Sequence, residues 1–226
     1  MKLQYLALTG LLLATKANAI ELYINHNLEH YSVELSREQG EVQINDLCFT
    51  TDSEESWIFV KYTDEREIWY EDGGEAGRGY VMPDKNVLET ILAKQKEVAE
   101  ISHYHIHPAK PSVMATPHHP SIDDSYYAIQ IATNVLEASP DIVFDDRVVT
   151  PYGIYVQSFA DEGLATHETR TKIRNIVSEP VIKAVETGNF PFDFKSDDVS
   201  VIRSEAHRYA AVISGENVTV TFIEMN

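Results

Sequence analysis

Hydrophobic and polar residues alternate along several short stretches of the chain, and this period of two predicts β-strands. Between residues 20 and 47 the alternation predicts short strands and no helix, with Gly40 in a turn. Residues 56–62 and 66–71 form the clearest pair of alternating stretches. The polar connection between them predicts a β-hairpin.

Apolar residues recur with helical spacing in two further stretches. Residues 87–100 predict a helix whose N-cap is Asp84 or Asn86, and residues 122–138 predict a second helix. A strand that carries several histidines lies between them, and residues 141–159 predict another hairpin. Helices and strands that alternate in this way indicate an α/β fold, in which helices cover a sheet.

The last part of the chain predicts a C-terminal α+β extension. Residues 161–187 predict a helical segment that ends at Gly188. Three alternating stretches follow and predict strands, with a hairpin turn at residues 214–217. These stretches are 199–204, 207–214 and 217–225.

The first 19 residues have the features of a secretory signal peptide. Lys2 precedes an apolar run over residues 3–14, and Ala17-Asn18-Ala19 forms a small-residue cleavage site. No later run is long enough to span a membrane. We therefore expect a mature protein without a transmembrane segment, located in the periplasm or secreted.

The chain is strongly acidic, with 36 Asp and Glu residues against 18 Lys and Arg residues and a formal net charge of −18. A surface of this sign repels nucleic acid and anionic membranes, so neither is an expected partner. Cys48 is the only cysteine and cannot form an internal disulfide. Its apolar neighbours indicate a small buried residue rather than a nucleophile.

Candidate chemistry gathers between residues 101 and 124, where five of the nine histidines lie. His105 and His107 are two apart on a predicted strand, so their imidazoles point to the same face. Ser121 is a suitable N-cap for the helix that follows, which places the carboxylate of Asp124 at the helix start. Two histidines and one aspartate with an open fourth position are the usual ligands of a catalytic zinc ion, whose bound water becomes the nucleophile.

Less specific interpretations exist for each of these residues. A histidine pair of this spacing also arises by chance, and Ser121 with Asp124 can be a capping box and nothing more. His118 and His119 precede the predicted helix. They can be additional or substitute metal ligands, although a solvated loop is the interpretation that we favour for both.

The order His105-x-His107-Pro108 and then Ser121-x-x-Asp124 resembles the signature of the JAMM/MPN+ zinc metalloproteases. The resemblance implies an MPN-type domain, which is a layered α/β fold similar to that of cytidine deaminases. It further implies that His105, His107 and Asp124 bind zinc. By the same resemblance, Ser121 stabilises the oxyanion of the tetrahedral intermediate.

The resemblance also implies a glutamate on an earlier strand as the general acid/base, for which Glu55 is our first choice and Glu54 the second. It covers about residues 52–160. Two features depart from the family. The connection at residues 108–120 is longer than usual, and the region before residue 50, where the family has its first strand and helix, predicts strands alone.

Together these features predict a secreted, zinc-dependent peptide or isopeptide hydrolase that acts on a polypeptide substrate. The alternative is a catalytically inactive metal-binding or protein-interaction module of the same fold, and a weaker one is a histidine-rich buffer for transition metals. The predicted organisation is a signal peptide at 1–19, a JAMM-like domain at 20–160 and the extension at 161–226.

Overall fold

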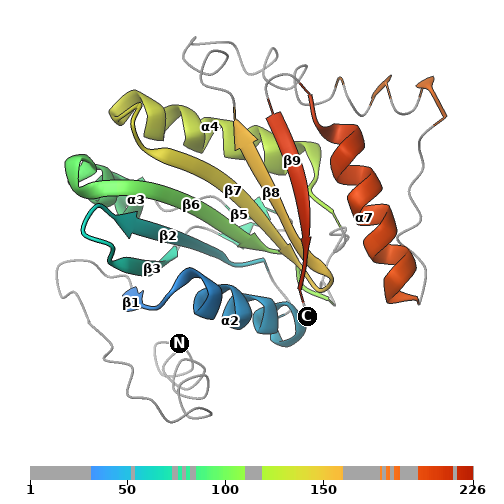
Figure 1. Ribbon diagram of the computed structural model, residues 1–226, viewed down its shortest axis with the longest axis horizontal. Coiled ribbons are helices and arrows are strands. Elements are labelled where there is room, and N and C mark those ends of the chain that lie inside the picture. The colour runs from blue at the N-terminus through green and yellow to red at the C-terminus, as the bar shows by residue number, and fades with distance from the viewer. Residues whose placement is uncertain are drawn as a thin grey trace.

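The protein is a mixed α/β fold built on a seven-stranded sheet (Figure 1). The predicted signal peptide at 1–19 and most of the segment 161–187 lie outside the residues that the structure describes. The computed structural model describes residues 32–51, 54–72, 76–77, 80–81, 85–109, 119–159, 179, 182–183, 186–188, 198–215 and 218–225.

The large sheet has the strand order β1-β3-β2-β6-β7-β8-β9, and β4 and β5 form a separate two-stranded ribbon. Neighbouring strands of the large sheet are antiparallel except for β6 and β7, which are parallel and are connected through α4. In chain order the elements are β1 (Ser32–Glu34), α2 (Arg37–Thr50), β2 (Ser56–Tyr62), β3 (Glu67–Asp72), β4 (Ala76–Gly77), β5 (Tyr80–Val81), α3 (Lys85–Leu92), a 3₁₀ turn (Gln95–Glu97), β6 (Val98–Ile106), α4 (Ile122–Ala138), β7 (Val143–Thr150), β8 (Gly153–Phe159), α7 (Val199–Ile213) and β9 (Val218–Glu224).

The sheet separates two hydrophobic cores. On one face, which we call the site face, apolar residues of α3, α4 and α7 pack on alternate strand residues such as Ile58, Ile101 and Val148. On the other face, the α2 face, α2 packs on intervening residues such as Phe59 and Tyr104 (Figure 1). Since successive strand residues point to opposite faces, this alternation determines which polar side chains can meet.

The prediction of strands alone between residues 20 and 47 is wrong, because α2 begins at Arg37. Ser36 Oγ accepts from the backbone N of Gln39 at 3.3 Å, and Gln39 Oε1 accepts from the backbone N of Ser36 at 3.2 Å. This capping box starts the helix. Gly40 lies inside the helix rather than in a turn, and a Cβ there would come within 2.1 Å of Trp69 Cε2. The glycine therefore lets the helix backbone lie directly on the Trp69 ring.

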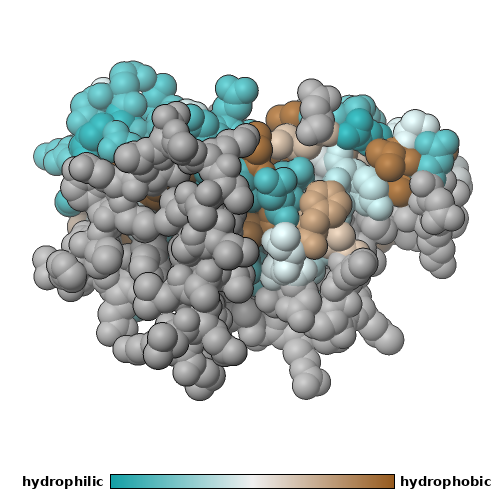
Figure 2. Space-filling view, turned by 90° about the horizontal axis from the view of Figure 1, so that it is seen from below, coloured by the Kyte–Doolittle hydropathy of each residue, from teal (hydrophilic) through white to brown (hydrophobic). Residues whose placement is uncertain are grey.

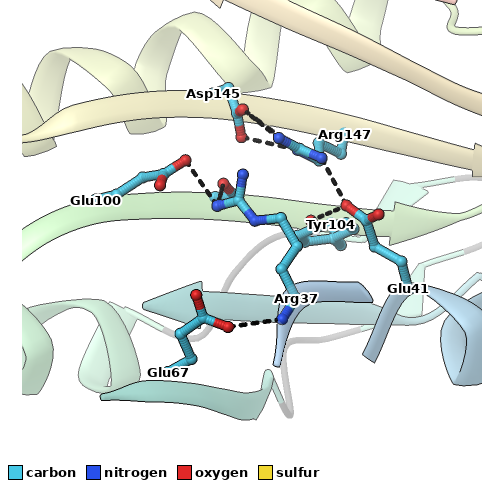
Figure 3. Close-up of polar contacts among 8 residues, drawn as sticks. Arg37, Glu41, Glu67, Glu100, Tyr104, Asp145 and Arg147 are labelled. Atoms are coloured by element: carbon cyan, nitrogen blue, oxygen red, sulfur yellow. Dashed lines mark hydrogen bonds and ion pairs between the residues drawn. The ribbon is translucent and has the colours of Figure 1, made fainter. Parts of the chain in front are cut away.

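Two ion pairs and a hydrogen bond hold α2 against three strands of the sheet (Figure 3). The Arg37 side chain lies 2.6 Å from Glu100 Oε1 on β6, and its backbone N donates to Glu67 Oε2 on β3 at 2.8 Å. From β7, Arg147 Nη1 lies 2.6 Å from Glu41 Oε1 on the helix. These contacts belong to the α2 face and are separate from the histidine-bearing face.

The middle of the chain follows the sequence prediction closely. The hairpin predicted at 56–71 is confirmed by β2 and β3, and the one at 141–159 by β7 and β8. The helix predicted at 122–138 is α4. The helix predicted at 87–100 ends earlier, at Leu92, because the polar run that follows offers no apolar face, and residues from 98 onward join the sheet as β6.

Two of the three strands predicted after residue 198 are wrong, because this stretch forms α7. Asp198 caps the helix, and its Oδ1 accepts from the backbone N of Ser200 at 2.9 Å. The third predicted strand is confirmed as β9, which pairs with β8 at the edge of the large sheet. The buried residues of α7 recur with helical spacing and join the core of the site face: they are Ile202, Ala206, Tyr209, Ala210 and Ile213.

Exposed apolar residues are scattered over several elements, as in ordinary globular proteins. Examples are Val42 and Phe49 of α2, which are 49% and 61% exposed. Seen from below, the described surface shows hydrophobic side chains beside hydrophilic ones (Figure 2). Among the described helices, none combines the length and the apolar character that a membrane crossing requires.

Candidate metal centre

Three histidines lie in a row on the site face at the end of β6. His103, His105 and His107 are two residues apart, so their side chains share a face. The ring centroids are 5.9 Å apart for the first pair and 5.1 Å apart for the second. Although β6 ends at Ile106, the backbone N of His107 still donates to Val149 O of β7 at 2.8 Å. The extended backbone thus brings the imidazoles of His105 and His107 side by side.

The first turn of α4 places a carboxylate opposite these two rings. Ser121 Oγ accepts from the backbone N of Asp124 at 3.1 Å, and Asp124 Oδ2 accepts from the backbone N of Ser121 at 2.5 Å. Asp124 Oδ1 lies 3.7 Å from His105 Nε2, and Oδ2 lies 3.5 Å from His107 Nε2. The capping box predicted from the sequence is confirmed, and it turns the carboxylate toward both imidazoles.

Electrostatic coupling between these buried groups is strong. Burial alone would raise the pKa of Asp124, but His105 and His107 hold it well below its usual range. Burial alone would lower the pKa of His105, but the Asp124 carboxylate raises it to about 9. A site of this kind favours positive charge between the rings and the carboxylate, whether that charge is a proton or a metal ion.

The residues present fit a metal ion. One donor atom each from His105, His107 and Asp124 lie within 4.8 Å of one another, and all three residues are buried. Among the described residues, His105 Nε2 and Glu54 Oε2 are buried side-chain atoms without a hydrogen-bond partner. Such atoms cost free energy unless something satisfies them. Two imidazole nitrogens and one carboxylate oxygen are a donor set that suits zinc.

The structure brings Glu54 to the histidines and places Glu55 elsewhere. Glu54 is 9% exposed and interacts electrostatically with both His105 and His107. Glu55 is hydrogen-bonded to Thr51 at the end of α2. The reason is the alternation along an extended chain: Glu54 points to the site face and its neighbour to the α2 face. Burial raises the pKa of the Glu54 carboxyl above its ordinary value.

A second group of buried potential ligands comprises His103, His105 and Asp146. In this group both ring nitrogens of His103 are already engaged. Nδ1 lies 2.6 Å from Asp146 Oδ1, and Nε2 lies 3.0 Å from Ser56 Oγ. Ser56, His103 and Asp146 therefore have the order of a Ser-His-Asp triad, but Ser56 is 3% exposed and donates to Asp72 Oδ2 at 2.7 Å. A hydroxyl used in this way is a structural donor rather than a nucleophile.

The solvated-loop interpretation of His119 is wrong. Its half-buried ring lies 4.5 Å from that of Tyr209, and its Nδ1 donates to Pro120 O at 2.9 Å. The Tyr209 hydroxyl donates to the same carbonyl at 2.6 Å. Burial lowers the pKa of His119, which interacts electrostatically with Asp124. His118 lies outside the described residues.

His103 was not among the residues predicted for the site, although the same spacing of two that pairs His105 with His107 extends to it. Asp146 and Ser56 left no signal of their own. Their partners come from neighbouring strands, so their contacts depend on strand register, which sequence alone does not specify.

A scan against models of known protein families gives no match to this chain, and a search of the curated proteins gives none either.

Proposed function

We propose that this chain is a zinc-dependent peptide or isopeptide hydrolase with an MPN/JAMM-type fold. The observation that carries the proposal is the buried cluster of His105, His107 and Asp124, with the unpaired Oε2 of Glu54 close to it. The predicted secretion to the periplasm or exterior and the polypeptide substrate are part of the same proposal.

The order of elements supports the fold assignment. The resemblance implies a first strand and helix before residue 50, and β1 and α2 occupy that region. A hairpin, the histidine-bearing strand β6 and the Ser-capped helix α4 then follow in the order that the resemblance implies. The element that the sequence pattern failed to predict, α2, thus brings the chain closer to the family.

His105, His107 and Asp124 would hold the zinc ion, each through one donor atom. When bound, zinc would polarise the scissile carbonyl and lower the pKa of a bound water toward roughly 7. Glu54 would act as the general base: its Oε2 has no competing hydrogen bond and its raised pKa makes the carboxylate more basic. It would accept the proton of the attacking water and deliver it to the leaving amine nitrogen.

Ser121 would contribute a hydrogen-bond donor. Its Oγ accepts from the backbone N of Asp124, which uses a lone pair and leaves the hydroxyl hydrogen able to donate. A donor at this position would stabilise the negative charge that develops on the carbonyl oxygen. The capping and catalytic roles of this serine are therefore compatible.

The test compares Glu54→Gln with the matched control Glu55→Gln. Neither residue belongs to the ligand cluster, so both variants should retain about one zinc ion per chain, measured by elemental mass spectrometry. Loss of a general base lowers the turnover number by roughly 10²–10⁴-fold, and we expect this loss in the Glu54 variant alone. Substrates would be a mixed peptide library and an isopeptide-linked protein pair.

Equal activity in both variants, or a loss confined to the Glu55 variant, would contradict the assigned role of Glu54. A wild-type protein that holds zinc but cleaves no substrate would support the inactive binding module instead. A wild-type protein that neither contains nor takes up zinc would overturn the proposed function.

A further inference from the structure

A continuous row of buried polar side chains crosses the site face behind the candidate metal centre. The row runs from β3 through β2, β6, β7 and β8 to the first turn of α4. In this order its members are Asp72, Ser56, His103, Asp146, Gln157 and Ser125, and all six are less than 9% exposed.

Hydrogen bonds connect every neighbouring pair of the row. Beyond the contacts of His103 described above, Gln157 Nε2 donates to Asp146 Oδ2 at 2.9 Å, and the Ser125 hydroxyl donates to Gln157 Oε1 at 2.6 Å. Strand pairing supports this order, because Asp146 is in register with both His103 and Gln157. The row is thus built into the sheet rather than assembled by chance.

The contacts of His103 within the row argue against a second metal ion there. Ser56 has a single hydroxyl hydrogen, which it donates to the Asp72 carboxylate, so it accepts from His103 Nε2. His103 Nδ1 lies 2.6 Å from Asp146 Oδ1. Both ring nitrogens of His103 are therefore already engaged by side chains of the row.

Three members of the row adjoin a residue of the candidate metal centre in the sequence. Ser56 is two residues after Glu54 and points to the same face, and His103 is two residues before His105. Ser125 directly follows Asp124 in the first turn of α4. The row thus connects α4, which carries Asp124, with β6, which carries His105 and leads into His107, and with β2, which Glu54 directly precedes.

We propose that this row, with His103 and Asp146 at its centre, positions the metal ligands by fixing β2, β6 and α4 relative to one another. His103 and Asp146 are positioning residues, and they act on the site through the backbone and through the negative charge of Asp146 beside His105. The inference rests on the proposed metal site, but its test does not require peptidase activity.

The decisive variant is Asp146→Asn. Each Asp146 oxygen has its own side-chain partner, so the new amide keeps one oxygen and sets its NH₂ group against either His103 Nδ1 or Gln157 Nε2. Loss of a side chain that orients metal ligands without binding the metal itself typically lowers metal affinity by about 10–100-fold, and we expect a loss in this range. The double variant Asp146→Asn/Gln157→Glu supplies an acceptor for the amide and restores the charge, so its zinc affinity should return close to the wild-type value.

Asp145→Asn is the matched control. Asp145 is the preceding residue on β7, is 8% exposed and pairs with Arg147 on the α2 face. The substitution should lower thermal stability and leave zinc affinity unchanged. Zinc affinity would be measured by chelator competition on the purified protein without a histidine tag, and ligand geometry by the visible absorption spectrum of the Co²⁺-substituted protein.

The proposal is supported if Asp146→Asn weakens zinc binding and alters the Co²⁺ spectrum, while the double variant recovers both and Asp145→Asn changes neither. It is overturned if Asp146→Asn binds zinc as the wild type does, or if both single variants lose affinity in proportion to their lost stability. Two zinc ions per chain, one of them lost in Asp146→Asn, would show instead that His103 and Asp146 are ligands. Absence of zinc in the wild-type protein would overturn the metal site itself, and this inference with it.

Discussion

The affinity of the protein for zinc should rise between pH 7 and pH 9. Zinc binds the neutral form of histidine, so at lower pH it must displace a proton from the His105 ring. Despite burial, the Asp124 carboxylate raises the pKa of this ring to about 9. Below pH 9 the proton therefore competes with zinc for His105, and above pH 9 this competition disappears.

The size of the effect follows from the distance between pH and pKa. At pH 7 the solution lies about two pH units below the pKa of His105, so the competing proton weakens zinc binding by about a hundredfold, or about 3 kcal/mol. The same proton stabilises the metal-free fold. Because the folded pKa lies above the unfolded value of about 6.5, this stabilisation is complete below pH 6.5 and is lost as the pH rises through 9.

Two measurements check this prediction. Chelator competition at pH 7, 8 and 9, corrected for the pH dependence of the chelator, gives the zinc affinity at each pH. Nuclear magnetic resonance titration of the metal-free protein gives the midpoint of each histidine ring, and His105→Ala identifies the resonance that belongs to His105.

Equal zinc affinity at pH 7 and pH 9 would contradict this prediction, and so would a metal-free protein in which no histidine titrates above pH 8. His207→Ala serves as the control. His207 is exposed on α7, where its Nε2 lies 3.2 Å from Glu224 Oε1, and its removal should leave the pH dependence of zinc binding unchanged.

Two further predictions concern the free energy of unfolding. Gly40→Ala should lower the free energy of unfolding by about 1–3 kcal/mol despite the better helix propensity of alanine, because the added Cβ would overlap the Trp69 ring. Denaturant unfolding measures this loss, with Asp46→Ala as the exposed-site control. A loss no greater than that of the control would contradict the prediction. Tyr209→Phe should lower the free energy of unfolding by about 1 kcal/mol, because the buried hydroxyl donates to Pro120 O; an unchanged melting temperature would show that this hydrogen bond is not stabilising.

The sequence predicted the elements whose hydrophobic pattern is clear within the segment itself. It missed α2 and α7, where a glycine or a short alternating stretch suggested strands. Gly40 suggested a turn, although it lies inside a helix because Trp69, far along the chain, requires the space. The pair Ser36 and Gln39 was a usable signal, since its spacing is that of a capping box. In α7, the alternation around Val201 suggested a strand, although the buried residues recur with helical spacing. Asp198, which caps the helix, was the sequence signal for a helix start.

In the candidate site, the sequence predicted the cluster but not the glutamate. His105, His107 and Asp124 were predictable because strand alternation and a helix cap are local rules. The choice between Glu54 and Glu55 depends on which face of the sheet each residue meets, and that depends on the register of β2 against β6. A shift by one residue exchanges the two side chains.

Both ends of the connection between His107 and α4 are anchored independently of what lies between them. The backbone N of Ala109 donates to Cys48 O at 2.6 Å, and Pro120 O accepts from the Tyr209 hydroxyl. Doubling the length of a chain segment whose ends are fixed costs only about 0.6 kcal/mol. Natural or engineered variation in the length and sequence of residues 110–118 should therefore be tolerated without displacing the histidines or Asp124, which makes this connection a suitable place to graft new specificity.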